Sequence, residues 1–392
     1  MARRYDWLVL NQSQSVAFQA MMGRLARELG PGMLLTGMPH PQDDRTSLRV
    51  ERAPSYARGA GSANRAASWL AYTAVAARCL QSVEGRPFVL AVTNPPMLPH
   101  LAWLFRRMRG LRYGLLIWDI YPEHIVRMGW AAPSHPLVKG WEALNRHALR
   151  EAELIVTLGH RMAKVVEAQA GPELPRPVEV IPNWADTNEM APRVKEENAF
   201  ARAHGQVGKV TVLYSGNMGA AHGLLPLVNA AADLKEDPNL SFMLIGDGLG
   251  RAEIEDALAP LASTNVVLLD YQPWDVIRQS IATADIAVVV EGPGSEGLSV
   301  PSKTYNALAT GAAILALTTK DSDLADLVEA HDVGRVCPPD DPRAIAETIR
   351  QMMQGDALSV MRANARRVAL EHYSADAAFR RWLDVLAPAV TS

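Results

Sequence analysis

The chain alternates short strand-like runs with amphipathic stretches along most of its length. Each run is rich in Val, Ile, Leu, Phe and Tyr, and a helix-like apolar pattern follows most of them. This alternation is typical of parallel β-α-β units. The predicted strands are Tyr5–Leu10, Met33–Thr36, Phe88–Val92, Tyr113–Ile117, Leu154–Thr157 and Val178–Ile181, then Val210–Tyr214, Phe242–Ile245, Val266–Leu269, Ile286–Val290 and Ile314–Leu317.

The alternation stops between Ala185 and Gly208, where polar residues punctuated by Pro and Gly replace the strand-like runs. A chain of 392 residues is also too long for one comfortable core. We therefore predict an α/β protein with two Rossmann-like, doubly wound domains, residues 1–186 and 187–372, and we interpret Ala185–Gly208 as the linker. Ligands of such sheets lie beyond the carboxyl ends of the strands, so two facing sheets predict a central cleft.

Composition excludes several other classes of protein. The net charge of −3 lacks the basic surplus of a nucleic-acid-binding protein. Apolar runs such as Ile286–Val290 are far shorter than the roughly 20 residues of a membrane-spanning helix. The apolar run Trp7–Leu10 is too short for a secretory signal, so we expect a cytoplasmic protein. Cys79 and Cys337 show no disulfide or zinc spacing, which favours reduced thiols.

Two glycine-rich loops follow predicted strands in the second half. The loop SGNMGAAHG (215–223) contains Gly216, Asn217, Gly219 and His222 and precedes an apolar helix. Glycines let the backbone approach an anion, and a helix N-terminus offers unpaired amides to it. A turn needed only for tight strand-to-helix packing would give the same pattern. The run around Gly246, IGDGLG, imitates a dinucleotide fingerprint but has the wrong glycine spacing.

The segment EGPGSEGLSVPSKTYNALATG (291–311) gives the strongest signal, because it has the order of strand, loop and helix that an anion site requires. Pro301 stands at the predicted helix entry, followed by Ser302 and Lys303. A Lys in the first turn opposes the helix dipole. We therefore predict that Lys303 meets a diphosphate; a solvated surface Lys is the alternative.

Taken together, SGNMGAAHG, LIGDGLGRAEIE, LLDYQP, ADIAVVV, EGLSVPSKTYNALATG and VCPPDDPRAIAETI resemble the donor half of glycosyltransferase family 4, whose members are retaining enzymes with the GT-B fold. They look most like the bacterial branch that builds O-antigen, colanic acid and related exopolysaccharides. The first half is similar but looser, through VTNPP (92–96), IWDIYPE (117–123), LIVTLGHRM (154–162) and VIPNWAD (180–186). The resemblance covers most of the chain and also places a C-terminal helix, 373–392, back on the first domain.

The resemblance assigns roles in the donor site. It implies that Glu296 contacts the transferred sugar, that the amides of Gly297, Leu298 and Ser299 hold the diphosphate, and that Asn306 meets the ribose where many relatives have Glu. The interval from Glu296 to Asn306 is two residues longer than the common pattern. Asn217 and His222 replace the Arg and Lys of many relatives, so charge neutralisation falls to Lys303 and the helix N-termini. The loop with Tyr271 and Gln272 is placed against the nucleobase.

Polar residues also follow the strands of the first half. Asn94, Asp119, Glu123 and His160 are candidates for binding acceptor hydroxyls, and Asp119 for steadying positive charge at the anomeric carbon. Turn capping by Asx side chains is the alternative for Asp119. In the helix predicted at 99–109, Trp103, Arg106, Arg107 and Arg109, joined by Arg112, would suit anionic lipid headgroups at the inner face of the membrane; a solvated face is the alternative.

We accordingly expect a retaining glycosyltransferase of surface polysaccharide synthesis, with Glu296, Asp119 and Lys303 as catalytic residues. Its donor is a nucleotide-sugar, UDP first and GDP second, and its acceptor a lipid-linked sugar or oligosaccharide. The sequence has no acidic pair of the kind that holds Mg²⁺ or Mn²⁺, so neither a metal nor another cofactor is expected. The alternatives are a nucleotide-sugar 2-epimerase of the same fold and a non-catalytic nucleotide-binding partner.

Overall fold

The computed structural model describes residues 4–40, 47–57, 62–219, 223–260, 265–292 and 294–391. The chain divides into two compact units, one formed by Met1–Pro182 with Ala378–Ser392 and the other by Asn183–Ala377. We call them unit 1 and unit 2. The predicted boundary at 186/187 lies four residues after the observed one.

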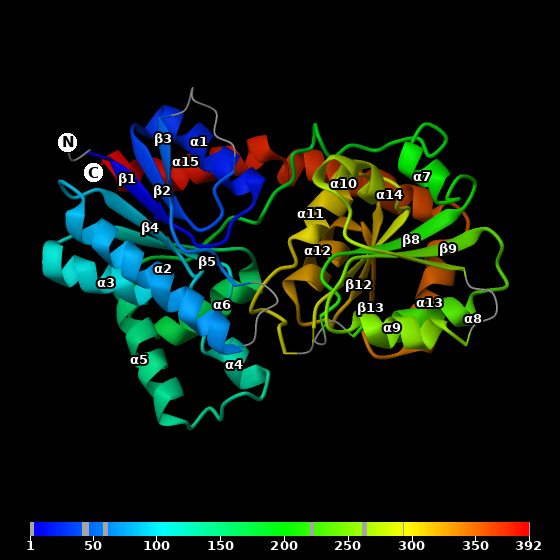
Figure 1. The fold of residues 1–392 in the computed structure, drawn as a ribbon, viewed down its shortest axis with the longest axis horizontal. Coiled ribbons are helices and arrows are strands. Elements are labelled where there is room, and N and C mark those ends of the chain that lie inside the picture. Colours follow the sequence, from blue (N-terminus) through cyan, green and yellow to red (C-terminus); the bar gives the residue numbers. More distant parts are fainter. Residues whose placement is uncertain are drawn as a thin grey trace. The chain divides into compact units, whose positions relative to one another are not determined.

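Unit 1 is built on one parallel sheet in the order β3-β2-β1-β4-β5-β6-β7. Its central strands are entirely buried because helices cover both faces (Figure 1). Its elements are β1 (Trp7–Leu10), α1 (Val16–Leu29), β2 (Gly32–Thr36), β3 (Leu48–Arg52), α2 (Ser62–Ser82), β4 (Phe88–Val92), α3 (Leu98–Arg109), β5 (Tyr113–Ile117), α4 (Glu123–Arg127), α5 (Pro136–Glu151), β6 (Leu154–Thr157), α6 (His160–Ala170) and β7 (Glu179–Val180).

Unit 2 repeats this plan with a parallel sheet in the order β10-β9-β8-β11-β12-β13. Helices α8, α9 and α13 cover one face, where they close a continuous apolar core, and α11 and α14 lie on the other (Figure 1). Its elements are α7 (Ala199–Ala203), β8 (Val210–Ser215), α8 (Leu225–Asp233), β9 (Leu240–Ile245), α9 (Arg251–Leu258), β10 (Val266–Leu269), α10 (Trp274–Ile281), β11 (Ile286–Val290), α11 (Lys303–Ala309), β12 (Ala313–Leu317), α12 (Asp323–His331), β13 (Gly334–Cys337), α13 (Pro342–Met352) and α14 (Ala357–His372).

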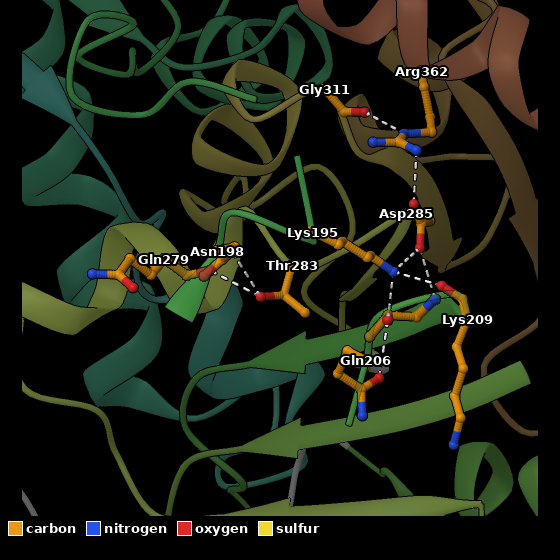
Figure 2. A network of polar contacts seen from close by, with 10 residues as sticks. Lys195, Asn198, Gln206, Lys209, Gln279, Thr283, Asp285, Gly311 and Arg362 are labelled. Atoms are coloured by element: carbon orange, nitrogen blue, oxygen red, sulfur yellow. Dashed lines mark hydrogen bonds and ion pairs between the residues drawn. The ribbon is translucent and has the colours of Figure 1, made fainter. Parts of the chain in front are cut away.

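The segment that we interpreted as a linker is instead an integral part of unit 2. The ammonium of Lys195 donates to Thr211 Oγ1 at 2.8 Å and pairs with buried Asp285, which also pairs with Arg362 at 2.7 Å (Figure 2). Asn198 caps α7 and donates to the Thr283 hydroxyl at 3.2 Å. The linker interpretation was wrong because polar residues with Pro and Gly also suit a segment that wraps a domain and satisfies its buried charges.

The chain returns to unit 1 through its last helix, α15 (Ala375–Thr391). Within unit 1 the Arg24 guanidinium lies 4.4 Å from the centroid of the Phe379 ring, and Trp382 and Leu386 are buried. The prediction of two Rossmann-like α/β sheets is confirmed. Strands β3 and β13 were not predicted.

Candidate functional site

The strand order of unit 2 changes direction between β8 and β11. From β8 the chain moves to β9 and β10 on one side, and from β11 it moves to β12 and β13 on the other. In open α/β sheets ligands bind at such a switch point, outside the carboxyl ends of the strands. The loops that leave β8 and β11 contain most of the predicted donor-site residues, so the topology brings them to one edge of this sheet.

The glycine loops after β8 and β9 pack backbone against backbone. The Gly216 amide donates to the Ile245 carbonyl at 2.9 Å, and the Met218 amide donates to the Asp247 carbonyl at 2.9 Å. Gly246 has φ +147°, and a Cβ built on it would lie 1.9 Å from the Gly216 oxygen. Only glycine fits there. Although its spacing is not that of a dinucleotide fingerprint, the second loop therefore fixes the shape of the first.

Lys303 connects the β11 side of the switch point to the β8 loop. Its Nζ lies 3.9 Å from the centroid of the Tyr214 ring, and a Cβ on Gly216 would lie 2.9 Å from the same nitrogen. The Tyr214 hydroxyl donates to the Asn217 carbonyl at 2.6 Å, which holds the ring in place. Tyr214 was not predicted as a site residue. Its position as the next-to-last residue of β8 was the available signal.

Lys303 is half-buried as a residue, and its ammonium meets no carboxylate among the described residues. Burial lowers the pKa of Lys303 to about 8. A cation in such a place gains from any anion that replaces the lost water. The helix that starts at Lys303, α11, is only seven residues long and has no side-chain cap. Its dipole is therefore a weaker source of anion binding than the Lys303 charge.

The loop after β11 carries Glu296 and the three predicted diphosphate amides. The Leu298 amide already donates to the Ser295 carbonyl at 3.0 Å, and Leu298 is fully buried. The amides of Gly297 and Ser299 have no bond with the rest of the described chain. The loop therefore offers two of the three predicted amides, beside a half-buried Glu296.

Glu291, the first residue after β11, was missed by sequence analysis. Its side chain is 2% exposed, and its Oε2 accepts from the Thr318 hydroxyl at 2.7 Å. Its Oε1 has no hydrogen-bond partner within the described structure. Burial, followed by the charges of Glu296 and Asp323, raises the pKa of Glu291 to about 7, although its hydrogen bonds oppose this rise. A polar residue directly after an all-apolar strand was the signal for it.

The remaining donor-side residues occupy loops or helix faces around this edge. Asn306 lies one turn after Lys303 on α11, and its side chain makes no hydrogen bond with the described residues. The Tyr271 hydroxyl donates to the Asp247 carbonyl at 3.4 Å, and its ring is 54% exposed. Gln272 donates to the Asp270 carbonyl, Asn217 and Ser302 are exposed, and Gly219 is half-buried. His222 lies outside the described residues.

Asp119 and Asn94 follow neighbouring strands in unit 1. The Thr93 hydroxyl accepts from the amides of Trp118 and Asp119, which joins the two loops. The Asn94 side chain donates to the Ser13 carbonyl at 3.3 Å, so it fixes the loop after β1. Burial raises the pKa of Asp119, and His124 opposes this rise. Asp119 also lines a cavity of about 30 Å³, which is too small for a sugar ring.

The other two acceptor-side predictions lie on helices. Glu123 begins α4 and accepts from the side chain of Gln169, so it is partly occupied by a structural bond. His160 is exposed at the start of α6. His124 lies near Asp119, and its Nδ1 is buried without a hydrogen-bond partner among the described residues.

The predicted lipid-binding face of α3 is largely engaged inside unit 1. Arg107 pairs with Glu151, to which Trp103 also donates at 3.0 Å. Arg106 and Arg112 pair with Glu153 at 3.1 and 2.7 Å, and Arg109 donates to main-chain carbonyls near the end of α2. The two glutamates offset half of the positive charge of the four arginines, the charge that would attract an anionic lipid.

The described residues contain no group of three or more His, Cys, Asp or Glu side chains placed to bind a metal ion. Nor does any helix in this part of the chain combine the length and apolarity needed to cross a membrane.

Known glycosyltransferases are similar to this chain in sequence. Residues 209–355, within unit 2, match the family described as "Glycosyl transferases group 1". The chain is 28% identical over 291 residues to the probable glycosyltransferase WbjE of Pseudomonas aeruginosa, covering 73% of this chain and 70% of that protein. It is 25% identical over 256 residues to the putative colanic acid biosynthesis glycosyl transferase WcaI of Escherichia coli K12, covering 64% of this chain and 62% of that one.

A solved structure shows the same fold. HepE of Anabaena, crystallised with UDP and glucose, superposes with a TM-score of 0.71 at 15% identity, over 97% of this chain and 99% of that chain. The GT-B fold is thereby confirmed. The predicted resemblance to bacterial family 4 enzymes is confirmed by the two relatives and the family match.

Proposed function

We propose that this chain, a bacterial glycosyltransferase of the family 4 type, transfers a sugar from a nucleotide-sugar to a lipid-linked or oligosaccharide acceptor in surface polysaccharide synthesis. UDP is the first candidate for the nucleotide, and GDP is the second. The reaction retains the anomeric configuration and needs no metal.

One observation carries the proposal: the half-buried Lys303 ammonium lies on the Tyr214 ring, beside Gly216, at the switch point of unit 2. No carboxylate of the described residues neutralises it. A diphosphate supplies the missing charge, and the amides of Gly297 and Ser299 supply hydrogen bonds to its oxygens. HepE, which has the same fold, was crystallised with UDP and glucose, and this supports UDP.

The chemistry then rests on charge stabilisation. The bond between the anomeric carbon and the phosphate oxygen breaks, and its electron pair leaves with the diphosphate, where Lys303 stabilises the added charge. The acceptor oxygen bonds to the same face of the sugar, and its proton passes to the departing phosphate oxygen. Glu296 holds sugar hydroxyls, and Asp119 steadies positive charge that develops at the sugar.

The test uses the full chain with UDP- and GDP-sugars. A thermal-shift panel first identifies the nucleotide, since a ligand at a hundred times its Kd adds roughly 2.7 kcal/mol of stability. The favoured donor is then incubated with lipid-linked acceptor, and the product's anomeric configuration is read by NMR. We expect transfer with retention in the presence of a chelator.

Glu296→Ala should abolish most of this transfer without changing the melting temperature. A second variant, Lys303→Met, removes the cation, and Lys235→Met is its matched surface control. Lys235 is exposed and precedes β9, so it lies on the side of the amino-terminal strand ends, away from the loops of the site. An epimerised donor formed without acceptor would indicate the 2-epimerase instead. Binding of nucleotide without any turnover would leave the non-catalytic role, and transfer unchanged by Glu296→Ala would refute the site.

A further inference from the structure

Glu291 is a buried carboxyl group with an unusual set of neighbours. Its Oε2 is bonded to the Thr318 hydroxyl, while its Oε1 has no partner among the described residues. The charged groups that act on it are Glu296, from its own loop, and Asp323, from the first turn of α12. Both are carboxylates. A second and a third negative charge in a dry site are unfavourable, so this environment favours the neutral acid.

A chain of hydrogen bonds through two hydroxyls starts at the Glu291 carboxyl and connects two structural elements. Thr318 Oγ1 lies 3.0 Å from Ser322 Oγ, and Ser322 caps α12 by accepting from the Ala325 amide at 3.0 Å. The Glu291 amide donates to the Leu317 carbonyl at 3.0 Å. Glu291 thus ties the start of the loop after β11 to the end of β12 through its main chain. Its side chain ties the same point to the start of α12, by way of Thr318 and Ser322.

The same loop folds back toward Glu291 through a tight turn. The Ser295 amide and hydroxyl both donate to the Gly292 carbonyl, at 3.1 and 2.5 Å. This turn directs the chain so that Glu296 acts electrostatically on Glu291. The residues offered to the donor, Glu296, Gly297 and Ser299, therefore follow directly from the segment that Glu291 anchors.

We propose that Glu291 is a positioning residue for this loop and that it holds the loop in its donor-binding conformation only while its own carboxyl is protonated. The inference rests on the proposed function, because it concerns the same donor site. When Glu291 ionises, its charge adds to those of Glu296 and Asp323, repels Glu296 from its donor-binding position, and repels the diphosphate. Donor binding therefore weakens as this one proton is lost.

The expected change in the Kd for the nucleotide follows from the fraction of protein in which Glu291 is protonated. The pKa of Glu291 is raised by burial to about 7, so at pH 8 roughly one molecule in ten keeps the proton. An apparent Kd equals the intrinsic Kd divided by that fraction, which predicts about tenfold weaker binding at pH 8 than at pH 6. In Glu291→Gln, a neutral amide of the same shape, this weakening should be absent.

The experiment measures binding of UDP and of GDP by calorimetry at pH 6, 7 and 8, for wild type and Glu291→Gln. The ratio of the two Kd values should be near one at pH 6 and should rise to about ten at pH 8. Titration of Lys303 and of the nucleotide phosphate affects both proteins alike and cancels in this ratio. Glu329→Gln, an exposed change in the last turn of α12, is the matched control and should behave as wild type.

Thr318→Val provides a second, independent variant. The Thr318 hydrogen bond lowers the pKa of Glu291, so its loss should move the binding transition to higher pH, whereas a merely structural defect would weaken binding equally at every pH. A Kd ratio that stays constant from pH 6 to 8, with an unmoved transition in Thr318→Val, overturns the role of Glu291 and leaves the proposed function standing. If neither nucleotide binds wild type at any pH, the donor site itself fails and the inference falls with it.

Discussion

The ammonium nitrogen of Lys303 lies 3.9 Å from the centroid of the Tyr214 ring, so the first residue of α11 and the next-to-last side-chain position of β8 form one cationic surface. A cation over an aromatic face gains about 0.5 to 2 kcal/mol, less than a carboxylate or phosphate partner provides. The pair therefore holds the charge in place while leaving it able to bind an anion.

Replacing Lys303 with Met should weaken UDP binding roughly 10- to 100-fold, since a hydrogen bond to a charged group contributes about 1.5 to 3 kcal/mol. The free energy of unfolding, in contrast to UDP binding, should not decrease. Burial lowers the pKa of Lys303 to about 8, so below that pH the ammonium is less stable in the folded state than in the unfolded state. Lys303→Met should melt no lower than wild type at pH 7, and wild type should gain relative stability between about pH 8 and 10.5. Calorimetry and thermal melts test both statements; a variant that loses binding and stability together would contradict them.

Replacing Gly246 with Ala should destabilise unit 2 and abolish nucleotide binding, because the new Cβ would overlap the Gly216 oxygen. A strained backbone and the overlap should together reduce the free energy of unfolding by about 2 to 5 kcal/mol. Gly205 also has a positive φ, but a Cβ there meets nothing within 4 Å. Gly205→Ala therefore measures the cost of a positive φ without a steric overlap, although at φ +65° rather than +147°, and urea unfolding of both variants measures the difference. Equal losses in the two would show that the loop contact is unimportant.

Replacing Glu291 with Gln should change how stability depends on pH. Because the pKa of Glu291 is raised from 4.5 to about 7, the folded state binds this proton more tightly than the unfolded state. The stability that this proton contributes is complete below about pH 4.5 and is lost as pH rises to 7. Wild type should therefore lose about 3 kcal/mol relative to Glu291→Gln over that range. Chemical denaturation at pH 5, 6, 7 and 8 gives the comparison, and parallel curves would count against it.

Replacing Asp119 with Asn should slow sugar transfer by about a hundredfold or more while leaving the Kd for UDP unchanged, since Asp119 belongs to unit 1 and the nucleotide contacts to unit 2. Asp6→Asn is the matched control, because Asp6 is exposed and precedes β1, on the side of the amino-terminal strand ends of the same sheet. Initial rates at saturating donor give the answer. Normal turnover in Asp119→Asn would reduce this residue to a turn-capping role.

Replacing Lys195 with Met should reduce the free energy of unfolding of unit 2 by about 3 to 5 kcal/mol, since it leaves part of the Asp285 charge buried without its partner. The exposed side chain of Lys209 forms no ion pair with the part of the chain that the structure describes, so Lys209→Met should be nearly neutral. Thermal unfolding of the two variants distinguishes a buried ion pair from a surface lysine.

Much of the fold could be predicted because buried parallel strands are continuous apolar runs. Phe88–Val92, Tyr113–Ile117, Leu154–Thr157, Val266–Leu269 and Ile286–Val290 were predicted with the bounds that the structure shows. The two missed strands lie at sheet edges, where burial on both faces is not required. Leu48–Arg52 carries three charged residues, and Gly334–Cys337 begins with Gly and contains Arg. Such compositions resemble loops.

The site was less predictable, because its decisive features are contacts between distant segments. Lys303 was identified from its place after a strand and a loop, yet nothing in the sequence pairs it with Tyr214. The Leu298 amide was assigned to the diphosphate, but a turn from Ser295 already uses it. Glu291 shows its chemistry only through burial and through Thr318, which is 27 residues away.

The ion pair between Lys195 and Asp285 limits where the junction of a chimeric protein can be placed. A chimera with a relative that joins the two sequences at Gly208 would take the lysine from one parent and the aspartate from the other. A junction at Pro182 would keep the pair within a single parent. Since the chain re-enters unit 1 after Ala377, exchanging unit 2 also requires a second junction there, and a single crossover would give every hybrid a mismatched final helix.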